Sequence, residues 1–321
     1  MPETNQQSNG TTYWVIGAVL IMVAAFVIIA LVLVYTQAEP VTQETDITNI
    51  SPTVDTLWIN DDGSTGANYT AGNPITLIAG DVKPIDIGGE VTDLNGADTI
   101  ESVALVFRRS GLTNACSADN NECYKVAACT LTANDTDTKN YECEVDLQYF
   151  ADSTSTGGAY PAETWVADVT VTDNDTVNPL TGNDSLDTNL GTLTALTIPG
   201  TINYGTLANN ESTSVAGGKT ETQTFEQAGN DETDVTVLGN DLGCDAGTIP
   251  VGNTQWALTA VDYDDPATTD LTGSSVTAAI DVQYQTSETV APTSALYWNI
   301  YVPYDVSGDC SGAATMTAVA H

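Results

Sequence analysis

Basic side chains are almost absent from this sequence. Its 321 residues contain 6 Lys and Arg against 43 Asp and Glu, which gives a formal net charge of −37 at pH 7. Nucleic acids and anionic lipid surfaces are recognised through Lys and Arg, so this charge makes both poor partners. Three explanations of the acid remain open: a salt-adapted or generally acidic surface, loading with divalent cations, or disorder.

Histidine and the common catalytic motifs are equally scarce. His321 is the only histidine, which argues against histidine-based triads and zinc hydrolase sites. No glycine-rich phosphate loop follows a predicted strand. Paired carboxylates can hydrolyse glycosides, but nothing singles out one pair among so many acids. Arg108 and Arg109 are adjacent, and we expect them to pair with nearby acids. The sequence therefore predicts neither an enzyme nor a resident cofactor, with Ca²⁺ as the one ion to consider.

One long apolar run stands near the start of the chain. Residues 13–35, YWVIGAVLIMVAAFVIIALVLVY, contain no charge over 23 residues. As a helix the run would extend roughly 34 Å, enough to cross a bilayer core. Tyr13, Trp14 and Tyr35 lie at its ends, where aromatic rings favour the membrane interface. We predict a polar tail over 1–12, a transmembrane helix over 13–35 and an extended stalk over 36–56.

A cleaved signal peptide and a buried soluble helix are the two alternatives to this helix. A cleaved signal peptide has a basic start and a shorter apolar core, and residues 1–12 contain Glu3 but no Lys or Arg. A buried soluble helix would need a partner able to cover an all-round apolar surface. The positive-inside rule gives no orientation, because the first basic residue is Lys83.

All six cysteines lie beyond the apolar run, which indicates disulfides in an oxidising compartment. A hairpin folded about Thr136 would place Cys129 opposite Cys143. The sequence spacing favours three pairs: Cys116–Cys123, Cys129–Cys143 and Cys244–Cys310. A four-cysteine metal site is the alternative, but CxxC spacing is absent. Oxidised cysteines favour an extracellular location for the C-terminal part of the chain.

Glycosylation sequons agree with that location. Beyond the predicted stalk, five asparagines begin an N-x-S/T sequence: Asn68, Asn134, Asn174, Asn183 and Asn210. In a chain this rich in Asn and Thr, several such matches arise by chance.

Beyond the stalk the apolar residues alternate with a period of two. Trp165, Ala167, Val169 and Val171 alternate with polar neighbours in TWVADVTVTDND, and similar runs recur between Gly, Asn and Asp turns. This pattern argues against disorder and predicts an all-β ectodomain of two antiparallel Ig-like β-sandwiches. The Pro-Gly step after Ile198 divides them into a cysteine-rich domain over 57–198 and a second domain over 199–321.

Short motifs resemble known surface modules. VADVTVTDND (166–175) resembles the final strand of bacterial and archaeal Ig-like modules of the PKD or cadherin-like type. Segments 200–218, 234–244 and 297–319 are similar to Ig-like domains of prokaryotic cell-envelope and filament proteins. The resemblance implies an adhesive or structural surface module and transfers no catalytic residue.

One acidic loop offers the ligands that Ca²⁺ prefers. The stretch 173–189, DNDTVNPLTGNDSLDTN, follows a predicted strand close to the domain boundary. Hard carboxylate oxygens at such a place suit calcium, with Asp173, Asp175, Asp184 and Asp187 as the predicted ligands. A solvated turn is the alternative, because Asn and Asp favour turns.

Two functions are consistent with these features. The first is a membrane-anchored cell-surface protein, held through residues 13–35, that displays its Ig-like domains for adhesion to other surface proteins or to copies of itself. The second is a subunit of an extracellular filament whose core is built from the apolar helix. VIGAVLIMVAAFVIIALVLVY resembles the N-terminal helix of archaeal type IV pilins, but the chain lacks their Lys/Arg-Gly processing site.

Overall fold

The computed structural model describes residues 18–26, 49–61, 69–70, 72–175, 180–198, 200–286 and 288–321. It divides into two units, Met1–Thr48 and Asn49–His321. In the first unit, residues 18–26 form a helix whose apolar side chains are exposed. Among the helices described here, none is long and apolar enough to span a bilayer. The remainder of the predicted 13–35 helix, the tail over 1–12 and the stalk as far as residue 48 lie outside the described residues.

Eight strands build the first β-domain. They are β1 (Thr53–Asp61), β2 (Lys83–Thr92), β3 (Ile100–Arg109), β4 (Cys123–Val126), β5 (Thr130–Ala133), β6 (Thr138–Leu147), β7 (Trp165–Asp173) and β8 (Thr181–Thr188), with a 3₁₀ turn, η1, at Ala97–Thr99. β1 begins at Thr53, so the ordered domain starts inside the segment predicted as stalk.

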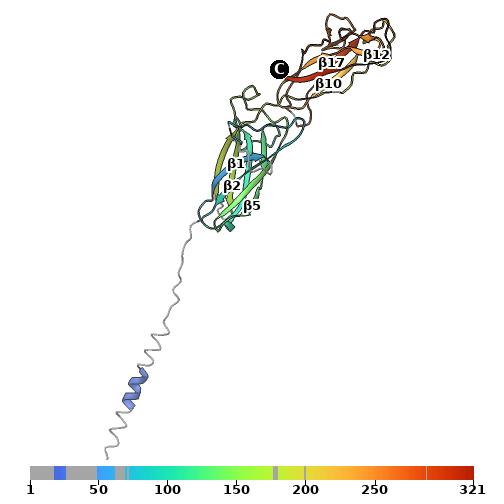
Figure 1. Ribbon diagram of the computed structural model, residues 1–321. Helices are drawn as coiled ribbons and strands as arrows, with labels where there is room; N and C mark the ends of the chain where they lie inside the picture. Colours follow the sequence, from blue (N-terminus) through green and yellow to red (C-terminus); the bar gives the residue numbers. More distant parts are fainter. Residues whose placement is uncertain are drawn as a thin grey trace, which may run out of the picture. The chain divides into compact units, whose positions relative to one another are not determined.

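The strand order of this domain is that of an Ig sandwich. One antiparallel sheet runs β1-β2-β6-β5 and the other β4-β3-β7-β8. Figure 1 labels β1, β2 and β5 of the first sheet. Lettered along the chain, these orders are A-B-E-D and C′-C-F-G, the two sheets of an Ig-type fold. The chain reaches this arrangement without an Ig-type disulfide between strands B and F, because its cysteines lie elsewhere.

The core between the two sheets follows the alternation seen in the sequence. Trp165, Val169 and Val171 of β7 are buried in one hydrophobic cluster with Ile85 and Ile87 of β2. Alternate residues of a strand point to one face, so the period of two becomes a buried face on each sheet. The prediction of an antiparallel all-β architecture is confirmed.

The second β-domain contains eleven strands. They are β9 (Leu196–Thr197), β10 (Glu221–Gln227), β11 (Thr233–Gly239), β12 (Leu242–Ala246), β13 (Thr248–Ile249), β14 (Thr254–Ala257), β15 (Thr269–Asp270), β16 (Val276–Val282), β17 (Thr293–Ile300), β18 (Ser307–Ser311) and β19 (Ala314–Ala320), with a 3₁₀ turn, η2, at Val251–Asn253. They form three antiparallel sheets, β15-β14-β17-β10-β9, β16-β11-β19 and β13-β12-β18. Figure 1 labels β10 and β17 of the first of these and β12 of the third.

This domain has its own core. Phe225 of β10 and Trp298 of β17 are fully buried in one cluster with Val235 and Val237 of β11. A smaller cluster around Ile300 lies beneath the β13-β12-β18 sheet. The last residue packed on the first core is Leu193 and the first on the second core is Leu196. The change of core therefore falls a few residues before the boundary placed at residue 198.

All six cysteines are joined in the pairs that their spacing favours. Cys116–Cys123, Cys129–Cys143 and Cys244–Cys310 are disulfides, and none of the six is free. Cys244 and Cys310 are direct cross-strand partners on β12 and β18. Cys143 of β6 meets Cys129 just before β5. Each bond thus lies within one domain: two close short loops, and Cys244–Cys310 joins residues 66 apart in sequence.

Buried amide side chains connect the two β-domains. The Nδ2 group of Asn230, in the second domain, donates to the backbone oxygens of Ala151 at 2.8 Å and Gly191 at 3.1 Å. In the opposite direction, Asn121 of the first domain donates to the backbone oxygen of Gln285 at 2.6 Å. Both asparagines are buried. Buried hydrogen bonds of this kind favour one geometry of the junction, because breaking them leaves unsatisfied polar groups.

Candidate functional site

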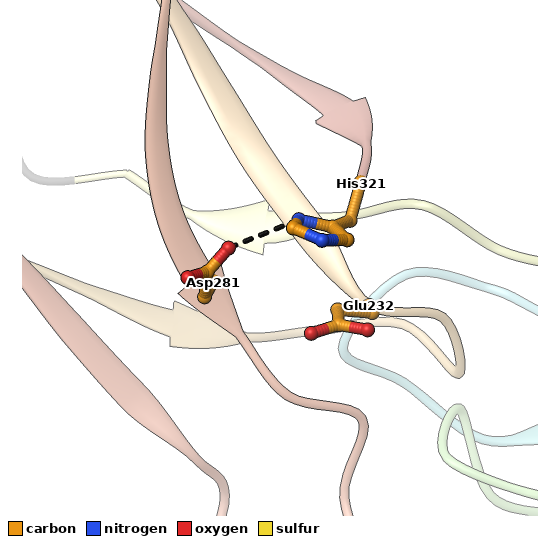
Figure 2. A group of neighbouring side chains, drawn as sticks. All are labelled: Glu232, Asp281 and His321. Carbon is orange, nitrogen blue, oxygen red and sulfur yellow. Dashed lines mark ion pairs between the residues drawn. The ribbon is translucent and has the colours of Figure 1, made fainter.

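Three ligand-bearing side chains meet at one end of the β16-β11-β19 sheet. Glu232 precedes β11, Asp281 lies in β16, and His321 follows β19 (Figure 2). The register explains their meeting, since Thr233 pairs with both Val282 and Ala320. The ligand atoms of Glu232, Asp281 and His321 lie within 4.8 Å of one another. Within the described ranges this is the one such group of His, Cys, Asp or Glu side chains.

A third acid, Asp234, contacts two members of the cluster. Asp234 of β11 is buried, and its Oδ2 atom lies 3.1 Å from Nδ1 of His321. Its Oδ1 atom accepts the backbone N–H of Asp281 at 3.0 Å. Asp281 has a φ of 48°, a left-handed conformation that Asp tolerates better than most residues. Its Oδ1 atom then lies 3.0 Å from Nδ1 of His321.

The protonation state of His321 decides what this cluster can do. The hydrogen bond to Asp234, followed by the negative charge of Glu232, raises the pKa of His321 above 6.5. The imidazolium form makes ion pairs that fix the end of β19 to β11 and β16. The neutral form instead offers a nitrogen beside two carboxylates, a mixed donor set that suits Zn²⁺ and related first-row ions. Metal binding would therefore release a proton and compete with the ion pairs.

Sequence reasoning missed this cluster. It considered His321 only as the sole histidine, and Glu232 and Asp281 carried no local motif. The three residues are far apart in sequence, and only the strand register of the β16-β11-β19 sheet brings them together.

The predicted calcium ligands are spread over a longer surface. Asp173 closes the β7–β8 turn by accepting the backbone N–H groups of Leu180 at 3.0 Å and Asp175 at 3.2 Å. Burial opposes ionisation of Asp173, but these hydrogen bonds lower its pKa. Asp184 and Asp187 are exposed on β8, three positions apart and so on opposite faces of the strand. Residues 176–179 lie outside the described residues, and calcium binding stays a prediction.

The sequon asparagines are exposed wherever the structure describes them. These are Asn134, Asn174, Asn183 and Asn210. Asn68 lies outside the described residues.

Arg109 is the centre of a buried charge cluster. Its Nε atom lies 2.8 Å from Oδ2 of Asp152, and its Nη1 atom lies 2.8 Å from Oε2 of Glu163. Glu122 makes a third ion pair, and the ring of Tyr160 lies 3.6 Å below the guanidinium. The expectation that this arginine serves nearby acids is confirmed. Its role is to hold together the loops that follow β3 and precede β7.

The neighbouring charges are also held locally. Arg108 pairs with Asp168 of β7 at 2.8 Å and donates to the backbone oxygen of Leu112 at 2.6 Å.

Burial raises the pKa of Asp152 to about 7, against the opposing influence of Arg109. Three carboxylates around one guanidinium carry excess negative charge, which favours the protonated form of the most buried one.

Comparison with known proteins adds little to this description. No family model matches the chain, and no curated protein is similar to it. One similar solved structure is reported as a chaperone–tip adhesin complex vital for CFA/I fimbriae biogenesis. The alignment covers 87% of this chain and 88% of that chain, with 11% sequence identity and a TM-score of 0.29. That similarity is too low to carry an argument, so the fold assignment rests on the strand order.

Proposed function

We propose that this chain is an extracellular structural or adhesion protein, anchored through residues 13–35, that displays two Ig-like β-domains. The observation that supports this most strongly is the pairing of all six cysteines in three disulfides. Disulfides persist in oxidising compartments and are rare in the cytosol. The acidic surface fits a protein that stays soluble outside the cell and avoids anionic partners.

The contacts of the charged side chains support binding or display in preference to catalysis. Its charged residues with catalytic potential are engaged in holding the fold: Arg109 joins three acids, and His321 makes ion pairs with Asp234 and Asp281. The hydrogen bonds of Asn230 and Asn121 hold the two domains together. A fixed pair of sandwiches is suited to presenting a surface at a distance from its attachment point.

The exposed helix supports attachment to an apolar environment. Over residues 18–26 it exposes Val19, Leu20, Ile21, Met22 and Phe26. Contiguous apolar side chains of this kind require a cover, which lipid would provide in an anchored protein. Neighbouring copies of the same helix would provide it in a filament, which keeps the filament subunit as the second candidate function.

Localisation and imaging on the native cell test the proposal. Intact cells are treated with a protease that does not cross membranes, and an antibody to the second β-domain follows the loss of the protein. We expect complete digestion, and protection until the cells are lysed would contradict an extracellular location. Negative-stain imaging of surface material then separates the candidates. Stalked particles on membranes indicate the anchored form, and regular fibres containing this chain indicate the filament subunit.

A further inference from the structure

A hollow of about 410 Å³ lies on the outer face of the β1-β2-β6-β5 sheet, beside Trp58. The register gives its first row of residues: Trp58 pairs with Gly88, Gly88 with Glu142, and Glu142 with Thr130. Trp58 is half-buried, whereas Glu142 and Thr130 are exposed. Across the four strands, this row therefore presents the indole of Trp58, the open position at Gly88, the carboxylate of Glu142 and the hydroxyl group of Thr130.

The second row is entirely polar. Thr56 pairs with Glu90, Glu90 with Asn140, and Asn140 with Thr132. All four line the same hollow as Trp58. The rows are two residues apart on every strand, so their side chains share the outer face.

Gly88 creates the space in which the indole lies. A Cβ atom at this position would be 2.5 Å from Cζ2 of Trp58 and 2.6 Å from the backbone oxygen of Tyr141. Glycine at position 88 therefore allows the indole ring of Trp58 to lie across the backbone of β2. The ring rests on the backbone of the sheet and forms one wall of the hollow.

The chemistry of the hollow matches a hydroxyl-rich, uncharged ligand. Three threonine hydroxyls, the amide of Asn140 and the carboxylates of Glu90 and Glu142 line it. These groups both donate to and accept from ligand hydroxyls. Asn134 donates to one oxygen of Glu90 and orients that carboxylate. In the part of the chain that the structure describes, no Lys or Arg lines the hollow, so its charge disfavours anions.

We propose that this surface binds a neutral saccharide, with one sugar ring packed through its C–H face on Trp58 and its hydroxyls hydrogen-bonded to Glu90, Asn140 and Glu142. The size of the hollow falls within the range of small-ligand sites, roughly 300–1,000 Å³. The inference deepens the proposed adhesion function, because it assigns a class of ligand to the displayed surface.

Titration of the purified, oxidised full chain tests the site. The chain is kept in a detergent without a sugar head group. The probes are lactose, cellobiose, mannobiose and N,N′-diacetylchitobiose, with sialyllactose as an acidic comparison. Calorimetry and tryptophan fluorescence measure binding. We expect at least one neutral probe to bind at millimolar concentration and sialyllactose to bind more weakly than lactose.

Four variants locate the site on the sheet. Trp58→Ala removes the aromatic wall and is expected to weaken saccharide binding about tenfold or more. Its control, Tyr304→Ala, removes an exposed aromatic side chain elsewhere and is expected to leave saccharide binding unchanged. Glu142→Gln is expected to weaken binding, whereas Glu144→Gln, two positions along the same face of β6, leaves it unchanged. Circular dichroism checks that each variant is folded.

Three results would overturn the proposal: no binding of any neutral probe, stronger binding of sialyllactose than of lactose, or full binding by a folded Trp58→Ala variant. Each is measured on purified protein and is independent of location. If the saccharide site fails these tests, the proposed extracellular role is unaffected. If the protein binds saccharides but is found in the cytosol, only the extracellular role is contradicted.

Discussion

The disulfide between Cys244 and Cys310 is expected to be the most stabilising of the three. It closes a loop with a sequence separation of 66, whereas Cys116–Cys123 spans a separation of 7. In the chain-entropy description, a cross-link stabilises by restricting the unfolded chain, and longer loops gain more. The expected contributions are about 4 kcal/mol for Cys244–Cys310 and about 2 kcal/mol for Cys116–Cys123.

Paired serine substitutions measure this difference. The variants Cys244→Ser/Cys310→Ser and Cys116→Ser/Cys123→Ser are unfolded in urea and followed by circular dichroism. Each variant affects a different domain, and the free energy of unfolding of each is compared with that of the wild-type chain. We expect the loss for the 244/310 pair to exceed the loss for the 116/123 pair by about 2 kcal/mol. An equal or smaller loss for the 244/310 pair would refute the loop-closure reasoning.

Three further substitutions test particular contacts of the fold. Arg109→Leu leaves the buried carboxylate of Asp152 and the half-buried carboxylates of Glu122 and Glu163 without their cation. It should lower the free energy of unfolding by about 3–5 kcal/mol in urea titrations, and a loss below that of Arg108→Leu would contradict the cluster. Asn230→Ala removes hydrogen bonds between the domains and should lower the free energy of unfolding by about 1–3 kcal/mol. It should also separate the melting transitions of the two domains in calorimetry. Unchanged melting would show that the junction does not depend on this amide. Because the folded-state pKa of His321 is raised above 6.5, its stabilisation is complete below that pH and is lost as the pH rises through the folded-state value. The difference in melting temperature between wild type and His321→Ala should therefore shrink with rising pH, and a difference that grows would rule out the ion pairs.

The local pattern of the sequence is sufficient for the antiparallel all-β class and for the cross-links between residues close in sequence. The alternation in β7 gives the inward Trp165 and Val169, because a strand has only two faces and one of them is buried. The pairing of Cys129 with Cys143 follows from the hairpin between them, which is local. The strand at Thr53–Asp61 begins before residue 57, where the sequence predicts the domain to start, because Pro52 and the Thr-rich stretch before it resemble a linker.

The functional surfaces depend on register between distant strands, which a single sequence does not specify. Glu232, Asp281 and His321 meet because β11 pairs with both β16 and β19. Trp58 gains its open neighbour only because Gly88 of β2 faces it, and Gly88 alone reads as an interruption of a strand. Local periodicity fixes which face a residue occupies, but the neighbours on that face come from the topology.

The number of free thiols in the protein from its native cell tests the extracellular account most directly. Cells are lysed directly into denaturant containing a thiol-alkylating reagent, and the mass of the intact chain is measured. The account predicts that none of the six cysteines is alkylated, because all are paired as disulfides. Alkylation of all six would mean a chain kept reduced in the cell and would contradict an extracellular location.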